Sequence, residues 1–199
     1  MSLTQPDCTT AVRVVMNAYL SVDSSASDSN SGSEALPWKT IQKAANSLYP
    51  GDTVLIKKGI YTELFGGSPD TGILAIKSQR SGLSGQYIVY KAYPGDTVVI
   101  DQTGKGPGFL IQSKNYIKIQ GFEIKNAISG GVYTVAGPQY IVIENNNIHD
   151  VDGGPGSNVG GIKFDGCRYC VARNNYIHDI TVAGTNTVFK NGANSAGIL

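Results

Sequence analysis

One sequence motif occurs twice in the second half of the chain. Residues 140–150 read YIVIENNNIHD and residues 169–179 read YCVARNNYIHD, while a weaker copy, YIKIQGFEIKN, occupies residues 116–126. The offsets of 24 and 29 residues lie in the range of stacked repeats, in which one unit alone cannot bury its apolar face. The chain is therefore expected to be a solenoid.

A second series has the same recurrence. Each member begins with glycine and places two inward positions on either side of one outward position. The members are Gly72–Ala75, Gly108–Ile111, Gly131–Thr134, Gly161–Phe164 and Gly197–Leu199. Their spacing varies while the short core of each member is kept. This pattern predicts constant coils joined by loops of different lengths.

The repeats alternate with a period of two, as strands do. Ile117 and Ile119 flank Lys118, and an asparagine-rich corner then precedes a second short strand. Asparagine suits tight corners because it tolerates left-handed backbone angles and can bond neighbouring backbone. Three short strands per coil, with coils about 4.8 Å apart, predict an all-β, right-handed parallel β-helix. A β-sandwich is the rival, but it predicts hairpin signals at shorter intervals.

An amphipathic helix is expected near the start of the chain. Pro37 opens it, the apolar stripe contains Ile41, Ala44, Ala45 and Leu48, and Pro50-Gly51 ends it. Such a helix can cover the open end of a β-helix, where core and strand edges would otherwise be exposed. Trp38 is expected to pack in this cap, with a sugar platform as the alternative.

The expected organisation is a leader over residues 1–10 and one β-helix domain over residues 11–199. The N-terminal cap occupies 11–50 and the coils occupy 51–199, and the coils are expected to continue beyond the end of this sequence. Strands are expected at 12–22, 53–57, 73–77, 87–92 and 97–101, before the regular coils begin at Gly108.

Composition excludes some classes of partner. The formal net charge is +1, which favours neither nucleic acid nor an anionic membrane, and no apolar run is long enough for a transmembrane helix. A monomer is expected. Cys167 and Cys170 form a lone CxxC without a second pair, so zinc is disfavoured. Cys170 is interpreted as a small core residue, with a Cys167–Cys170 disulfide as the alternative.

The N-terminal region resembles a known family. It carries the loop DSNSG at residues 28–32, then PWKTIQKAA, PGDTV and GIYTE from residue 37 to residue 63. This run resembles the cap and first coil of secreted right-handed parallel β-helix proteins, especially family 9 pectate lyases and the alginate and chondroitin lyases. The resemblance implies an extracellular protein that cleaves uronate-containing polysaccharide by β-elimination, with a lysine or arginine base and possible use of calcium.

The outward positions of the glycine-led series offer candidate site residues. Tyr133 is expected one coil below Lys163, with Asp165 beside it and Arg168 just beyond. β-Elimination needs a base near the proton alpha to a carboxylate and a cation to neutralise that carboxylate. Lys163 and Arg168 are therefore the catalytic candidates, and Tyr133 and Asp165 the substrate-binding ones. Solvated surface charges are the alternative interpretation.

Other features have interpretations of their own. His149 and His178 are expected to stack one coil apart, as a surface ladder fixed by the repeat or as an acid/base pair or metal site. Asp23 and Asp28 are read as turn chemistry, with calcium as the alternative, and no metal site is assigned. The loops 152–160 and 181–194 are expected to border a groove.

The sequence leaves two classes of function open. One is a secreted polysaccharide lyase. The other is a non-catalytic β-helix with a carbohydrate-binding, adhesive or structural role, since the same fold hosts several functions.

Overall fold

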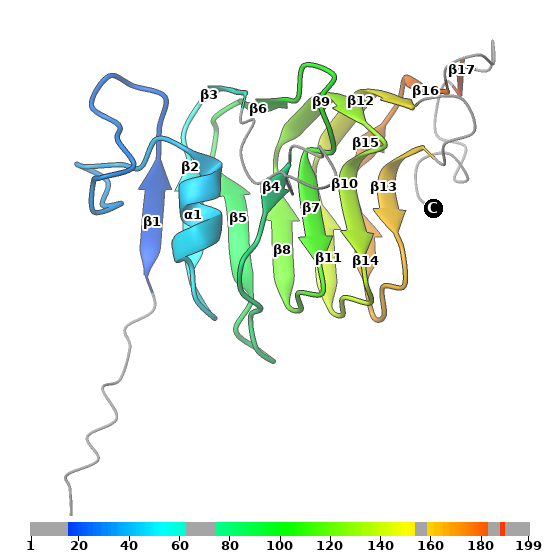
Figure 1. Cartoon of the computed structure of the whole chain (residues 1–199). Helices are drawn as coiled ribbons and strands as arrows, with labels where there is room; N and C mark the ends of the chain where they lie inside the picture. Colours follow the sequence, from blue (N-terminus) through cyan, green and yellow to red (C-terminus); the bar gives the residue numbers. More distant parts are fainter. Residues whose placement is uncertain (1–15, 63–74, 154–158, 183–187, 190–199) are drawn as a thin grey trace, which may run out of the picture.

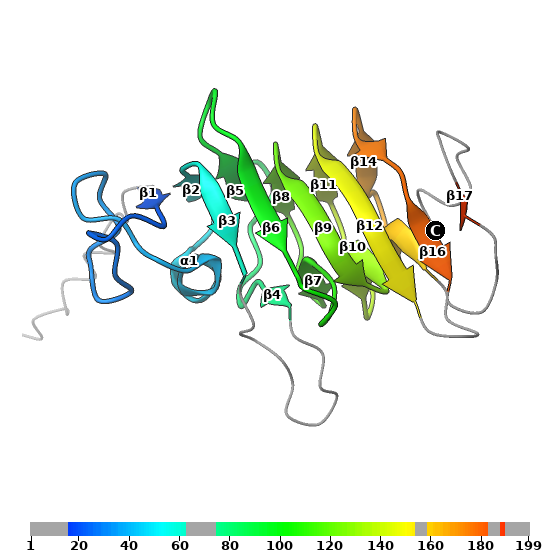
Figure 2. The ribbon, with the colours of Figure 1, turned by 90° about the horizontal axis from the view of Figure 1, so that it is seen from above.

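The computed structural model describes residues 16–62, 75–153, 159–182 and 188–189. Its strands form three sheets, named here A, B and C (Figures 1 and 2). Sheet A contains β1 (Asn17–Leu20), β2 (Thr53–Ile56), β5 (Ile88–Ala92), β8 (Ile117–Gln120), β11 (Ile141–Glu144) and β14 (Val171–Arg173). Sheet C contains β4 (Ile76–Lys77), β7 (Phe109–Gln112), β10 (Gly130–Val135) and β13 (Gly160–Phe164).

Sheet B completes each coil. It contains β3 (Gly59–Tyr61), β6 (Val98–Asp101), β9 (Glu123–Ile128), β12 (Asn147–Gly153), β15 (Tyr176–Ile177), β16 (Ile180–Val182) and β17 (Val188–Phe189). Within the described residues every strand pairing is parallel except that of β16 with β17. Figure 2 shows sheet B as one row of arrows that advances with the sequence. The expected parallel β-helix is confirmed.

Equivalent residues of successive coils lie in one column. Ile143 on β11 is in register with Ile119 on β8 and with Ala172 on β14. Ile119 and Ile143 are fully buried, and Ala172 packs against the same core. The period-2 alternation of the sequence therefore produces one continuous apolar interior, because inward side chains of each coil meet those of the next.

An asparagine ladder connects the coils at the corner between sheets A and B. The Asn146 side chain is 2% exposed; its Oδ1 accepts the backbone N–H of Phe122 at 3.0 Å. Its Nδ2 donates to the Ile119 carbonyl and to Asn175 Oδ1, and Asn175 repeats the pattern with the Ile143 carbonyl. The corner thus supplies hydrogen bonds to backbone groups of sheet A and of the turn that follows it.

Sterics explain why a glycine stands at the start of β7, β10 and β13 in sheet C. A Cβ on Gly131 would overlap Cγ2 of Ile148, and a Cβ on Gly161 would overlap Cγ2 of Ile177. Gly108 meets Ile124 in the same way. The inward isoleucine of sheet B therefore fills the space that a side chain on the glycine would need, coil after coil.

A tyrosine ladder marks the corner before sheet A. The rings of Tyr116, Tyr140 and Tyr169 are stacked, with centroids 4.6 and 4.9 Å apart. All three residues have left-handed backbone angles, with φ of 55°, 57° and 55°. Non-glycine residues seldom adopt this conformation, and the favourable contact between the stacked rings offsets part of its cost.

The cap helix is shorter than expected. Helix α1 spans Ile41–Ser47 and lies at the N-terminal end of the stack (Figure 1). The start expected at Pro37 is wrong, because Thr40 has extended backbone and its hydroxyl caps the helix by accepting the Lys43 N–H. Asp28 holds this start in place, since its oxygens accept from the Lys39 and Thr40 N–H groups and the Thr40 hydroxyl.

Trp38 is part of the cap. Its side chain is buried, its ring lies against Gly32, and its indole N–H donates to the Asn30 carbonyl. This placement confirms the cap interpretation and is incompatible with an exposed sugar platform.

Two strands in the N-terminal part of the chain are shorter in the described residues than the sequence predicted. In the expected strand 73–77, Ile76 and Lys77 form β4, and Ile76 pairs with Phe109 and is fully buried. The glycine-led series, in which Leu74 is the outward position, predicts Leu74 beside Leu110; this is wrong, because the register of β4 places Lys77 beside Leu110. Residues 11–15 of the first expected strand, residues 72–74 and residues 197–199 lie outside the described residues.

An ion pair network joins three coils on sheet A. Glu144 accepts hydrogen bonds from Arg173 Nε at 2.6 Å and lies 3.3 Å from Lys118 Nζ. Burial alone would raise the pKa of the Glu144 carboxyl, but the hydrogen bonds from Arg173 and Lys118 outweigh it. They hold that pKa below its ordinary value of 4.5.

The network predicts a component of stability that depends on pH. A carboxyl whose pKa is lowered on folding stabilises the fold above its unfolded pKa, and this contribution is lost as pH falls through the lowered value. Glu144→Gln is expected to reduce the fall in urea stability between neutral pH and a pH below 4.5. Glu34→Gln, at an exposed pair with Lys57, is the control and should leave that fall unchanged. An unaltered fall in the Glu144 variant would contradict the assignment.

Candidate functional site on sheet C

Tyr133 and Lys163 meet on the outer face of sheet C. β10 and β13 pair in parallel with Tyr133 in register with Lys163, which places the two side chains on the same face one coil apart. The Lys163 ammonium lies 4.2 Å from the centroid of the Tyr133 ring. The two strands lie side by side in Figure 1. The glycine-led repeat predicted this pair because it predicted the register.

Asp165 joins the pair from the end of β13. Burial raises the pKa of the Tyr133 phenol, and the charge of Asp165 and a hydrogen bond to its carboxylate raise it further. The phenol therefore stays protonated and donates to Asp165. Burial also lowers the pKa of the Lys163 ammonium, against the opposing charge of Asp165.

This cluster of Tyr133, Lys163 and Asp165 combines three chemical abilities. A lysine with a lowered pKa holds more neutral amine near pH 7, as a general base requires. The phenol oxygen of Tyr133, whose one proton is donated to Asp165, can accept a hydrogen bond from a sugar hydroxyl, and the ring offers an apolar surface. The neighbouring carboxylate orients the phenol, and Tyr133 and Lys163 lie on paired strands.

Arg168 lies apart from the cluster, on the corner between β13 and β14. Its backbone N–H donates to the Pro138 carbonyl and its own carbonyl accepts the Tyr140 N–H. Its side chain is exposed. A disulfide between Cys167 and Cys170, with Cα atoms 6.0 Å apart, closes the corner around it. The structure thus brings together three of the four predicted site residues and leaves Arg168 at the neighbouring corner.

The calcium implied by the family resemblance finds no matching ligand set in the described part of the chain. No group of three or more histidine, cysteine, aspartate or glutamate side chains there is arranged to hold a metal ion. Both oxygens of Asp28 accept hydrogen bonds at the start of α1, and Asp165 accepts the hydrogen bond of the Tyr133 phenol.

The expected histidine ladder is present on the outer face of sheet B. The rings of His149 and His178 are stacked, with centroids 4.8 Å apart and planes 8° from parallel. Nδ1 of each bonds the aspartate that follows, Asp150 at 2.7 Å and Asp179 at 2.8 Å. Nε2 of each also has a partner, Glu123 or Asn147. Since all four ring nitrogens are engaged, the interpretation as a surface ladder is favoured over an acid/base pair.

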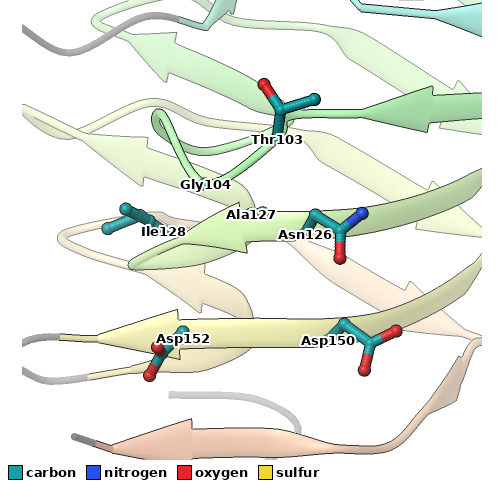
Figure 3. Close-up of a pocket in the computed structure, with 7 residues that line it drawn as sticks. All are labelled: Thr103, Gly104, Asn126, Ala127, Ile128, Asp150 and Asp152. Carbon is teal, nitrogen blue, oxygen red and sulfur yellow. The ribbon is translucent and has the colours of Figure 1, made fainter.

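Sequence reasoning missed a hollow beside this ladder (Figure 3). It has a volume of about 440 Å³ and is lined by Thr103, Gly104, Asn126, Ala127, Ile128, Asp150 and Asp152. Asn126 on β9 and Asp150 on β12 have left-handed backbone angles, so the row of outward side chains along each of these strands bends there. The signal available in the sequence was the outward Asp152, two residues beyond the repeated His-Asp pair.

No helix in the part of the chain that the structure describes is long and apolar enough to cross a membrane.

Comparison with solved structures finds the same fold at low sequence identity. Pectate lyase Pel9A is 18% identical with a TM-score of 0.52, over 93% of this chain and 58% of its own. The GH136 lacto-N-biosidase from Eubacterium ramulus is 16% identical with a TM-score of 0.61, over 83% and 42%. XylC, solved with xylose, is 13% identical with a TM-score of 0.53, over 83% and 54%.

Sequence comparison points in the same direction. The uncharacterized protein YwoF of Bacillus subtilis (strain 168) is 27% identical over 146 residues, which is 67% of this chain and 29% of that protein. The chain thus spans less than a third of this relative. A family model described as the Pel9A-like, right handed beta helix region matches residues 19–191. The chain therefore belongs to the Pel9A-like right-handed β-helix family.

Proposed function

We propose that this chain is an extracellular carbohydrate-active protein that cleaves a uronate-containing polysaccharide by β-elimination. The supporting observation is the sheet C cluster, in which a lysine with a lowered pKa lies over a tyrosine ring on an open strand face. Membership of the Pel9A-like right-handed β-helix family supports the substrate class, because Pel9A is a pectate lyase. The extracellular location and the elimination reaction are both part of the proposal, because a fold alone does not determine function.

The proposed reaction uses the residues in distinct roles. The Tyr133 ring and hydroxyl hold the uronate unit, and the Arg168 guanidinium on the adjoining corner pairs with the substrate carboxylate. The neutral Lys163 amine removes the proton alpha to that carboxylate. The electrons of the broken C–H bond form a carbon–carbon double bond as the bond to the leaving sugar oxygen breaks, and solvent supplies a proton to that oxygen.

Charge and burial explain why Lys163 rather than Tyr133 is assigned as the base. The pKa of Lys163 is lowered, which makes proton acceptance possible at a milder pH. The pKa of Tyr133 is raised by burial and by Asp165, so the phenolate that a tyrosine base requires is disfavoured. Tyr133 is therefore a hydrogen-bond acceptor and a platform in this proposal.

Lys163→Met is expected to reduce the elimination rate by about 10²- to 10⁴-fold, because a positioned base contributes that much. The reaction is followed by the ultraviolet absorbance of the unsaturated uronate on pectate, alginate and glycosaminoglycan. Lys91→Met, a half-buried lysine on sheet A, is the matched control and should retain full activity. Equal rates for wild type and Lys163→Met would remove Lys163 from the mechanism.

A non-catalytic carbohydrate-binding role is the second candidate. It is favoured by the position of the ammonium over the Tyr133 ring, since a charged lysine held there can pair with a uronate carboxylate without accepting a proton. In that case all three polysaccharides should give binding without any rise in absorbance.

A further inference from the structure

We propose that the outer face of sheet B carries a second saccharide site, built for a short neutral glycan. The site extends from the exposed ring of Tyr176, past the His149 and His178 stack, to the hollow beside Asp150 and Asp152. It lies on a different sheet from the cluster of Tyr133, Lys163 and Asp165 and goes beyond the function proposed for that cluster.

The hollow offers the contacts that a sugar ring requires. Three successive coils line it, with Thr103 following β6, Asn126 and Ile128 on β9, and the two aspartates on β12 (Figure 3). Ile128 is 38% exposed and supplies an apolar surface for the C–H groups of a ring. Amide, hydroxyl and carboxylate groups surround this surface, and they are the side chains that bond sugar hydroxyls.

Part of this bonding capacity is already used in holding the site in shape. Asp150 Oδ2 is bonded to His149, Asp152 Oδ1 accepts the Gly153 N–H, and Asn126 Nδ2 donates to Asp101. These bonds fix the orientation of three lining side chains. The second oxygen of each aspartate has no hydrogen bond to another of the described residues. Each can therefore accept from a ligand hydroxyl in a charge-assisted bond.

Tyr176 supplies an aromatic platform on the same face. Its side chain is 60% exposed, and its ring is held against His178 with centroids 4.6 Å apart. Tyr176 is in register with Asn147, three residues before Asp150 on β12. At about 3.3 Å per residue the platform lies about 10 Å along the strand from the hollow, a distance that a short oligosaccharide bridges.

The charge of this face selects the class of glycan. Among the outward residues of β6, β9, β12 and β15, Lys125 is the one lysine or arginine, while Asp101, Glu123, Asp150 and Asp152 are carboxylates. The exposed Lys105, in the turn that also holds Thr103 and Gly104, adds a second positive charge near the hollow, and the face remains acidic. An acidic surface repels a polyuronate and imposes no such penalty on a neutral sugar. The two faces are thus suited to different glycans, with the lysine on sheet C facing the acidic one.

The test is a titration of the ¹⁵N-labelled chain with neutral xylo-, arabino- and galacto-oligosaccharides in the presence of a chelator. Binding of at least one is expected to shift the amide signals of Gly104, Ile128 and Gly153. Asp152→Asn and Tyr176→Ala are each expected to weaken that binding about tenfold, as the loss of one charge-assisted bond or one stacked ring implies. Tyr169→Ala is the matched control, an exposed tyrosine of the same coil outside sheet B, and should bind as wild type does.

Several outcomes would overturn the proposal. These are no shift with any of the three neutral glycans, equal binding by wild type and both variants, or shifts of these amides that require added calcium. Stronger binding of a uronate oligosaccharide at the same amides would also overturn it. Because the titration requires no turnover, its result is independent of whether the chain cleaves polyuronates.

Discussion

Replacing Asn146 by alanine is expected to lower the free energy of unfolding by about 3 kcal/mol or more, since several buried groups lose their partners at once. The Phe122 N–H loses its acceptor, and the Ile119 carbonyl loses a donor, at a corner where water has no access. The bond to Asn175 in the next coil is lost as well. Urea unfolding monitored by circular dichroism measures the change.

Asparagine 145 provides the control for this prediction. Asn145 precedes the ladder, is exposed, and has a φ of 57° that glycine adopts readily. Asn145→Gly should therefore change stability by only about 0.5 kcal/mol. Asn146→Asp, which keeps the shape but loses the donor and introduces a charge, should be as harmful as the alanine variant. If Asn146→Ala were as mild as Asn145→Gly, the ladder would not stabilise the coils.

Replacing Gly131 by alanine is expected to cost about 1–3 kcal/mol or more, because the added methyl group overpacks the interior. The new Cβ would overlap Ile148 Cγ2 and would lie 3.0 Å from the Gly161 carbonyl oxygen. The adjacent Gly130 is the matched control. A Cβ there would meet nothing closer than the Gly160 carbonyl oxygen, at 3.3 Å, so Gly130→Ala should be clearly milder.

A double-mutant cycle identifies the cause of the Gly131 effect. Ile148→Ala is itself expected to destabilise by about 2–5 kcal/mol through the cavity that it creates. In that background Gly131→Ala should cost at least about 1 kcal/mol less than in wild type, because the two groups no longer compete for the same space. Additive effects would show that the glycine is required for another reason.

The sequence was sufficient for the fold because the interior is repetitive. The single interior column of Ile119, Ile143 and Ala172 follows from the alignment of the repeats alone. Local details at the first coils were not predictable in the same way. The β4 register does not follow the spacing of the glycine-led series, and the start of α1 depends on Asp28, a residue distant in sequence from Thr40.

The candidate site was predictable only in part. Tyr133 and Lys163 were paired correctly because they occupy one column of the glycine-led repeat. The orientation of Arg168 depends on the corner that the disulfide closes, and repeat spacing says nothing about a corner. The hollow on sheet B was missed because it forms where two rows bend at left-handed residues, Asn126 and Asp150, and period-2 alternation assumes straight strands.

The mass of the oligosaccharides released from a polyuronate tests the proposed reaction most directly. β-Elimination creates a double bond without adding water, so each product with a new non-reducing end should be lighter by one water molecule than the corresponding hydrolysis product. These unsaturated products should be formed by the wild-type chain and be nearly absent with Lys163→Met. Products that have gained water, or equal amounts of unsaturated product from both proteins, would contradict the proposal that Lys163 is the base of a lyase.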